Sequence, residues 1–173
     1  MDFKVGDKVV YPNHGVGIIE QISFGQLNGR TERYYMLRIL ASGLRVTVPL
    51  TNVTAVGLRP LIRTTEAEKV ISFLERGKCD CHHDWKHRFK ENSERMRTGS
   101  LLDVATVLKS LVALSRNKPL SFREKKMLER ARHLLVTELA MARRTTEETV
   151  ESSLAKALAK SKLQFPVILD SFD

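Results

Sequence analysis

The sequence predicts an α+β protein in which a small, bent N-terminal β-sheet or open barrel precedes a bundle of about five α-helices. The first reason is a change of hydrophobic period. Apolar residues alternate at strand spacing up to about residue 60 and recur at helical spacing from about residue 64. The second reason is that helix-capping pairs occur in the later part of the chain. We therefore expect domains at residues 1–60 and 64–165, with a C-terminal tail at residues 166–173.

The N-terminal part contains four or five strand-like runs that are joined by turns. Pro12-Asn13-His14-Gly15 is a dense turn signal, and Asn28-Gly29 is the dipeptide most typical of a tight hairpin. Residues 44–48 alternate, which predicts that Leu44, Val46 and Val48 share one face of a strand. Arg45 and Thr47 are then expected together on the opposite face. Short strands with tight turns favour a strongly bent sheet.

The C-terminal part shows helical spacing and recognisable helix ends. Four pairs of a capping residue and an acidic residue indicate helix starts: Thr65 with Glu68, Ser100 with Asp103, Ser121 with Glu124, and Thr145 with Glu148. A further helix is expected from Asp84 to Thr98, closed by Gly99. Pro119 separates the third helix from the fourth, and Pro166 ends the last one.

Length and composition limit the class of protein. Of the 173 residues, 42% are apolar and 28% are charged. This apolar fraction is large enough for the chain to bury a hydrophobic core. No apolar run approaches the ~18 residues of a membrane span, and the first residues lack the apolar segment of a secretory signal. Cys79 and Cys81 lie too close in sequence to staple a fold. We therefore expect a cytoplasmic protein with no membrane contact.

Positive charge is concentrated in one part of the chain. The net charge is +9, and residues 76–144 alone hold 17 Lys and Arg against 8 Asp and Glu. The net charge of this segment therefore equals the net charge of the whole chain. Such crowding is typical of a protein that binds a polyanion, although a solvated helix surface is the alternative explanation.

No motif for catalysis is recognisable. Gly15-Val16-Gly17 lacks the third glycine of a dinucleotide fingerprint, and the sequence has no nucleophile elbow, zinc-protease motif or phosphate loop. We therefore expect neither enzyme activity nor a cofactor. The segment Cys79-Asp80-Cys81-His82-His83 has atoms that could bind Zn²⁺, but apart from His87 no second group of ligands accompanies it. We expect a connector between helices at this segment, and no metal.

The residues after this segment are the most informative of the basic region. Trp85 is the single tryptophan, and it stands at a helix start among Lys86, Arg88 and Lys90. Phe89 follows at helical spacing, so Trp85 and Phe89 could both belong to the core. A tryptophan among cations also suits stacking on bases. Spacing leaves both possibilities open. A second basic surface is expected on a later helix, from Arg123, Lys125, Lys126, Arg130 and Arg132.

Four segments together resemble the CarD family of bacterial transcription regulators: KVGDKVVYPNHGVG, VTVP, DWKHRFKEN and LSFREKKMLERARHLLVTELA. The resemblance covers roughly residues 1–160, in the family's order and spacing. It implies a Tudor-like N-terminal domain that binds the RNA polymerase β subunit, as the corresponding domain of transcription-repair coupling factors does. It also implies a helical domain that contacts the minor groove and backbone of promoter DNA with little sequence specificity. The function implied is stabilisation of the open promoter complex, and the location implied is the nucleoid.

The resemblance assigns roles to individual residues of the helical domain. Trp85 matches the family tryptophan that wedges into the minor groove at the edge of the transcription bubble. Lys90 and Lys125 match family cations near the DNA backbone, and Lys86 and Arg88 are expected beside them.

The residues expected to contact polymerase match the family pattern less closely than those of the helical domain. The family carries arginines where this chain has Gly25 and Thr47. Arg45 shares the strand face of Thr47 and could replace one of them, so Arg45 and Thr47 are the expected polymerase-binding residues. Two other functions stay open at this point. One is an architectural DNA-binding protein that acts without polymerase, and the other is a metal-dependent enzyme built on the Cys/His segment.

Overall fold

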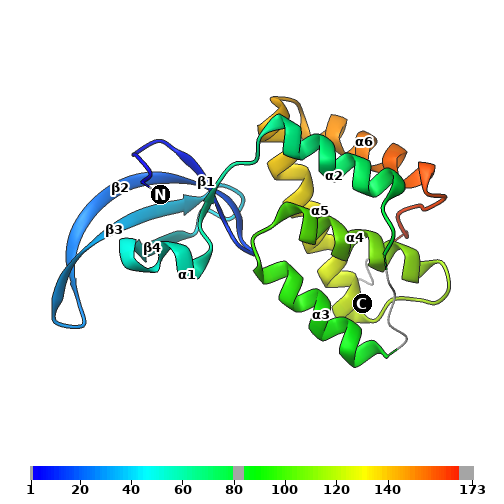
Figure 1. The fold of residues 1–173 in the computed structure, drawn as a ribbon, viewed down its shortest axis with the longest axis horizontal. Helices are drawn as coiled ribbons and strands as arrows, with labels where there is room; N and C mark the ends of the chain where they lie inside the picture. Colours follow the sequence, from blue (N-terminus) through cyan, green and yellow to red (C-terminus); the bar gives the residue numbers. More distant parts are fainter. Residues whose placement is uncertain (1, 80–83, 168–173) are drawn as a thin grey trace.

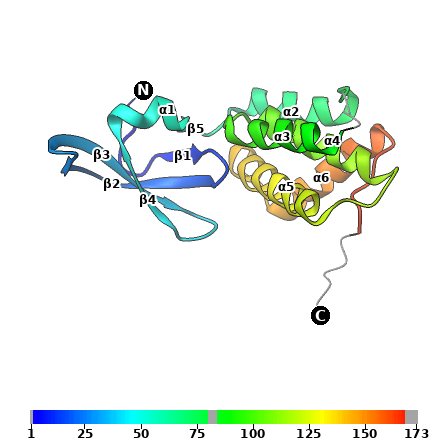
Figure 2. The same cartoon turned by 90° about the horizontal axis from the view of Figure 1, so that it is seen from below.

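The computed structural model describes residues 2–79 and 84–167, which form a sheet domain and a helical domain side by side (Figures 1 and 2). The sheet domain holds β1 (Lys8–Tyr11), β2 (Gly15–Leu27), β3 (Arg30–Ile39), β4 (Arg45–Pro49) and β5 (Arg59–Pro60). A 3-10 turn (Leu50–Asn52) and the short helix α1 (Val53–Val56) connect β4 to β5. The strands form one open antiparallel sheet in the order β4-β3-β2-β1-β5, which confirms the predicted fold class.

The sheet curves around a small apolar core of its own. Its buried members are Phe3, Val9, Ile19, Tyr35, Leu37, Val48, Val53 and Leu58. The Tyr35 hydroxyl accepts a hydrogen bond of 3.0 Å from the Phe3 backbone N–H, so the buried phenol oxygen is satisfied. β2 and β3 stay paired out to Leu27 and Arg30, well beyond the last residues paired with β4, and form a long arm (Figure 1).

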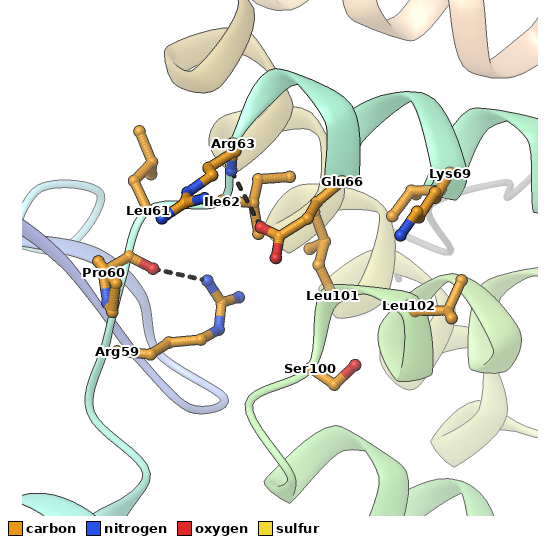
Figure 3. A pocket seen from close by; sticks show the side chains of 11 residues that line it. Arg59, Pro60, Leu61, Ile62, Arg63, Glu66, Lys69, Ser100, Leu101 and Leu102 are labelled. Atoms are coloured by element: carbon orange, nitrogen blue, oxygen red, sulfur yellow. Dashed lines mark hydrogen bonds between the residues drawn. The ribbon is translucent and has the colours of Figure 1, made fainter.

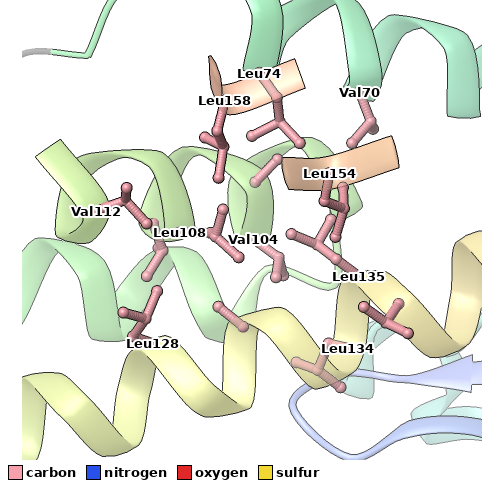
Figure 4. Packing of buried hydrophobic residues seen from close by; sticks show 14 of the residues in the cluster. Val70, Leu74, Val104, Leu108, Val112, Leu128, Leu134, Leu135, Leu154 and Leu158 are labelled. Carbon is pink, nitrogen blue, oxygen red and sulfur yellow. The ribbon is translucent and has the colours of Figure 1, made fainter. Parts of the chain in front are cut away.

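The helical domain contains α2 (Thr64–Arg76), α3 (Trp85–Arg97), α4 (Leu101–Ser115), α5 (Phe122–Arg143) and α6 (Glu147–Lys160). α4 is the central helix, because it packs against α2, α3 and α5. Figure 4 shows how Leu74, Leu108, Leu135 and Leu154 from four different helices meet in the core. Within residues 2–79 and 84–167, no helix combines the length and the hydropathy that a membrane crossing requires.

Two of the four predicted helix caps are confirmed and two are wrong. Ser100 and Ser121 cap α4 and α5 as expected. α2 is capped by Arg63, two residues before the predicted cap Thr65, because the Ala67 N–H already bonds to Arg63 O and Glu66 accepts from the Arg63 N–H.

The cap of α6 is Thr146 rather than Thr145, and the reason lies in the preceding helix. The Thr145 N–H bonds to Ala140 O and thereby still belongs to the end of α5. Thr146 is the next residue, and its hydroxyl accepts from the Thr149 N–H. A correction also applies to Leu44, which lies in the turn before β4 and is 48% exposed instead of buried with Val48.

The β1–β2 turn lies against the helical domain. Pro12 is buried, and a Cβ placed on Gly99 would lie 3.0 Å from Pro12 Cγ. On the other side of the turn, a Cβ on Gly15 would lie 3.3 Å from Leu134 Cδ2. Gly99 and Gly15 have φ angles of +80° and +97°, so both need glycine for their backbone conformation as well as for space. We call this contact region between the domains the seam.

Candidate nucleic-acid interface

Trp85 is the first residue of α3, and its side chain faces solvent. The Asp84 carboxylate caps the helix by accepting from the Lys86 N–H at 3.1 Å, which fixes Trp85 in the first turn. Trp85 is 52% exposed, whereas Phe89 is half-buried. The structure therefore decides against the possibility that Trp85 is a core residue, which the sequence left open. A large exposed aromatic side chain is a candidate for binding.

Arg88 does not lie where the sequence placed it. It was expected among the DNA-binding cations, but it is only 4% exposed. Its Nε and Nη2 donate to Glu124 Oε2 at 3.2 and 3.1 Å. The reason is helical geometry: Asn92 and Met96, four and eight residues later, are also buried, so Arg88 belongs to the buried face of α3 and turns away from solvent. Its charge is used to hold α3 against α5.

The ion pair brings two helix starts together. Arg88 lies in the first turn of α3 and Glu124 in the first turn of α5, so both N-termini lie at the same end of the bundle. Lys86, Lys90 and Lys125 are exposed there. Helix N-termini carry partial positive charge, which adds to that of the three lysines. The combination of cations and helix ends favours phosphate binding.

A basic groove of about 400 Å³ runs between α3 and α5, away from Trp85 and toward the seam. Its cations are Arg97, Arg123, Lys126 and Arg130, and its apolar lining comes from Phe89, Met96 and Met127. The Arg123 guanidinium lies 5.8 Å from the centre of the Phe89 ring, which holds the charge at the rim. None of the described residues that line the groove is acidic. It therefore extends the positive surface that begins at the helix N-termini.

The expected polymerase-binding residues lie on the exposed side of the edge strand β4. Arg45 has a side chain that is 70% exposed, and Thr47 is exposed beside it. Glu20 is placed between two arginines, with its carboxylate 3.3 Å from Arg45 Nε and 2.6 Å from Arg38 Nε. The ion pairs thus hold Arg45 over the sheet without burying it.

Gly25 has a local structural explanation. A Cβ at this position would lie 2.6 Å from Cε1 of Tyr34 on the neighbouring strand. The ring occupies the space that a side chain at position 25 would need. An arginine at this position would have to displace Tyr34.

The structure also contains a feature that sequence reasoning missed. A pocket of about 580 Å³ opens where the chain passes from β5 into α2, opposite the start of α4 (Figure 3). Arg59 lines it, and the Arg59 side chain extends toward the helical domain. Its guanidinium pairs with Glu138 of α5, 79 residues away in sequence. No periodicity or motif connects two residues at such a separation.

The Cys/His segment is described only in part. Cys81, His82 and His83 lie outside the described residues, as does most of the tail at 166–173. Cys79 is half-buried, and its Sγ lies 4.0 Å from Thr106 O. Within the described part of the chain, no group of three or more His, Cys, Asp or Glu residues is placed to hold a metal.

Comparisons with known proteins find similarity in both domains. The family described as "CarD-like/TRCF RID domain" matches residues 3–62, and that described as "CarD, C-terminal domain" matches residues 69–155. A Bacillus subtilis (strain 168) protein, "Putative transcription factor YdeB", is 31% identical over 150 residues, which are 87% of this chain and 98% of that protein.

Two solved structures from Myxococcus xanthus each match about a third of this chain. The solution structure of the 72-residue N-terminal domain of CarD is 36% identical, covers 34% of this chain and 79% of that one, and has a TM-score of 0.31. The structure described as CdnLNt is 44% identical, covers 36% of this chain and 87% of that one, and has a TM-score of 0.31.

Proposed function

The chain belongs to the CarD family of transcription factors, which is a non-enzymatic family, and from this premise we propose that it stabilises the open promoter complex of RNA polymerase. The sheet domain binds the polymerase β subunit, and the helical domain binds promoter DNA at the upstream edge of the transcription bubble. No bond is made or broken. The protein acts by binding one state of the promoter more tightly than another.

The sheet domain anchors the protein. Arg45 and Thr47 on the exposed side of β4 are the proposed contacts with the β subunit. Once anchored, the helical domain is held near the promoter, so its binding to DNA becomes an intramolecular step at high effective concentration. Recruitment by polymerase, more than base sequence, then determines where the protein acts, because backbone contacts carry little sequence information.

The helical domain binds DNA through the end of the bundle at which α3 and α5 begin. Trp85 inserts at a distorted base step in the minor groove, while Lys86, Lys90 and Lys125 contact phosphates. The basic groove continues this phosphate-binding surface toward the seam. Insertion of an aromatic wedge is easier where the bases are already unstacked, so binding shifts the population toward the open complex by that difference in affinity.

The observation that carries this proposal is the exposure of Trp85. A tryptophan that is 52% exposed beside two helix N-termini contributes little to the core and is available to bases. The test is the lifetime of open complexes formed by polymerase holoenzyme on a promoter, with and without the protein. We expect the protein to lengthen the lifetime, and expect Trp85→Ala to abolish most of that effect.

The alternative function is that of an architectural DNA-binding protein independent of polymerase. A salt-sensitive gel shift with equal affinity in the presence and absence of polymerase would support the alternative. Loss of binding to the isolated β subunit on mutation of β4, together with unchanged binding to free DNA, would support the function proposed here.

A further inference from the structure

One ion pair at the seam joins the two domains with defined geometry. Arg59 Nη1 and Nη2 donate to the two carboxylate oxygens of Glu138 at 2.6 and 2.9 Å. Arg59 Nε donates to Gly99 O, and Glu138 Oε1 accepts a second bond, of 3.2 Å, from the Ile62 N–H. Glu138 is 2% exposed. A guanidinium whose three nitrogens all donate to fixed acceptors has its plane and direction determined.

Steric contacts at the seam reinforce this arrangement. Pro12 packs closely against both Gly57 and Gly99, since a Cβ built on each would lie 3.2 and 3.0 Å from Pro12 Cγ. The connection between the domains, residues 61–63, is only three residues long. Ile62 in that connection is itself bonded to Glu138. The linker, the turn and the ion pair thus restrain rotation and bending at the same place.

We propose that Arg59 and Glu138 are positioning residues that fix the angle between the polymerase-binding domain and the DNA-binding domain. The inference rests on the proposed function. Anchoring on polymerase helps Trp85 to reach one base step only if the connection between the domains directs the helical domain toward that step. The effective concentration of the helical domain at the DNA falls to near zero when geometry forbids both domains from binding at once. A connection that is already ordered also avoids the entropy cost of ordering on the promoter.

The first test separates the binding of each domain from their joint action. Glu138→Gln keeps the size of the buried side chain and removes its charge. Arg59→Lys keeps the positive charge and removes the planar guanidinium group that donates two parallel hydrogen bonds. We expect both variants to bind the isolated β subunit and a bubble-containing DNA within about twofold of wild type. The lifetime of open complexes should nevertheless fall about tenfold, which corresponds to ~1.4 kcal/mol. Glu75→Gln, which breaks the Glu75–Lys160 pair of 2.9 Å inside the helical domain, is the matched control.

The second test measures the angle itself and does not depend on transcription. Spin labels are attached at Asn28→Cys on the sheet arm and Lys156→Cys on α6, in a chain with Cys79→Ser and Cys81→Ser. The distance distribution should be narrow in the labelled parent and in the Glu75→Gln control, and should broaden with Glu138→Gln or Arg59→Lys.

The outcomes are distinct for the two proposals. An unchanged distance distribution in both seam variants overturns the positioning role, as does an unchanged open-complex lifetime. A parallel loss of β-subunit binding, DNA binding and thermal stability would show a merely structural pair and would also overturn it. If the wild-type protein does not lengthen open complexes, the proposed function fails, and the distance distribution alone then shows whether Arg59 and Glu138 hold the domains together.

Discussion

Arg88 and Glu124 form a buried ion pair that joins the first turn of α3 to the first turn of α5. Their side chains are 5% and 7% exposed. Glu124 also accepts from the Ser121 N–H at 3.4 Å, so the same carboxylate caps α5 and holds α3. The pair thereby places exposed Trp85 at the same end of the bundle as Lys125, and it explains why one arginine of this basic region is buried.

Breaking this pair should destabilise the helical domain. Removing one partner of a buried ion pair typically costs about 3–5 kcal/mol, because the other charge stays buried without compensation. We expect this loss in the free energy of unfolding for Arg88→Ala, measured by urea denaturation. The double variant Arg88→Ala with Glu124→Ala should lose less than the sum of the two single variants. Strictly additive losses would show that the pair is not coupled.

Replacing Trp85 should leave stability almost unchanged and should impair function. Because the side chain is half exposed, Trp85→Ala should change the free energy of unfolding by less than about 1 kcal/mol. Stacking on a base is worth about 1–3 kcal/mol, so the lifetime of open complexes should fall roughly tenfold to a hundredfold. Trp85→Phe should be intermediate. A large fall in melting temperature with equal loss of every activity would instead place Trp85 in the core.

Charge reversal at the helix N-termini should weaken DNA binding without changing its sequence preference. For Lys90→Glu and Lys125→Glu we expect lower affinity for any duplex and a salt slope reduced by about 1 for each phosphate that the protein no longer neutralises. Fluorescence anisotropy over a range of salt concentrations measures both. Lys156→Glu is the control, because Lys156 is exposed on α6, outside the two helices whose N-termini carry Lys90 and Lys125. Equal losses in all three variants would indicate nonspecific attraction to overall charge.

Arg45→Glu should weaken binding to the β subunit and leave binding to free DNA unchanged. The exposed ion pair with Glu20 is worth at most about 1 kcal/mol, so the sheet should stay folded. Arg33→Glu on the arm is a matched control, because Arg33 is exposed but does not pair with β4. Surface plasmon resonance with the β subunit tests both variants. Unchanged affinity for Arg45→Glu would remove Arg45 from the interface.

Lys109 should give the protein a measurable pH dependence. Its Nζ donates to Phe73 O and Gly77 O at 2.9 and 2.6 Å, and burial lowers its pKa below the usual 10.5, with a smaller opposing effect from Cys79. The unfolded chain then binds the proton more tightly than the folded one. The free energy of unfolding should therefore rise with pH just below 10.5, relative to Lys109→Met at each pH. Parallel pH curves for the two proteins, from thermal melts, would contradict this.

The fold was largely predictable because local signals and tertiary packing agree. The changes of hydrophobic period, the Asn28-Gly29 turn and the caps at Ser100 and Ser121 all depend on neighbouring residues. The two misplaced caps depend on which backbone hydrogen bond is the first or last of a helix. At Thr145 the N–H still bonds to Ala140 O after the left-handed residue Arg144, and the spacing of capping residues does not show this.

The candidate site was predictable only in part. The position of Trp85 at a helix start follows from spacing, but its exposure does not, since helical spacing also allowed it to pack with Phe89. Arg88 was misplaced because sequence does not show which helix face meets α5. The Arg59–Glu138 pair could not be predicted either, because its two residues are far apart in sequence and are brought together only when the two domains dock.

The burial of the β1–β2 turn has a consequence for how the chain is made. The turn at Pro12 emerges from the ribosome early, whereas Leu134 and Glu138, which cover the seam, follow more than a hundred residues later. Domains generally fold as units during synthesis, the N-terminal one first. We therefore expect the nascent sheet domain to hold this turn at least partly uncovered until α5 has emerged, so that the two domains dock late in synthesis.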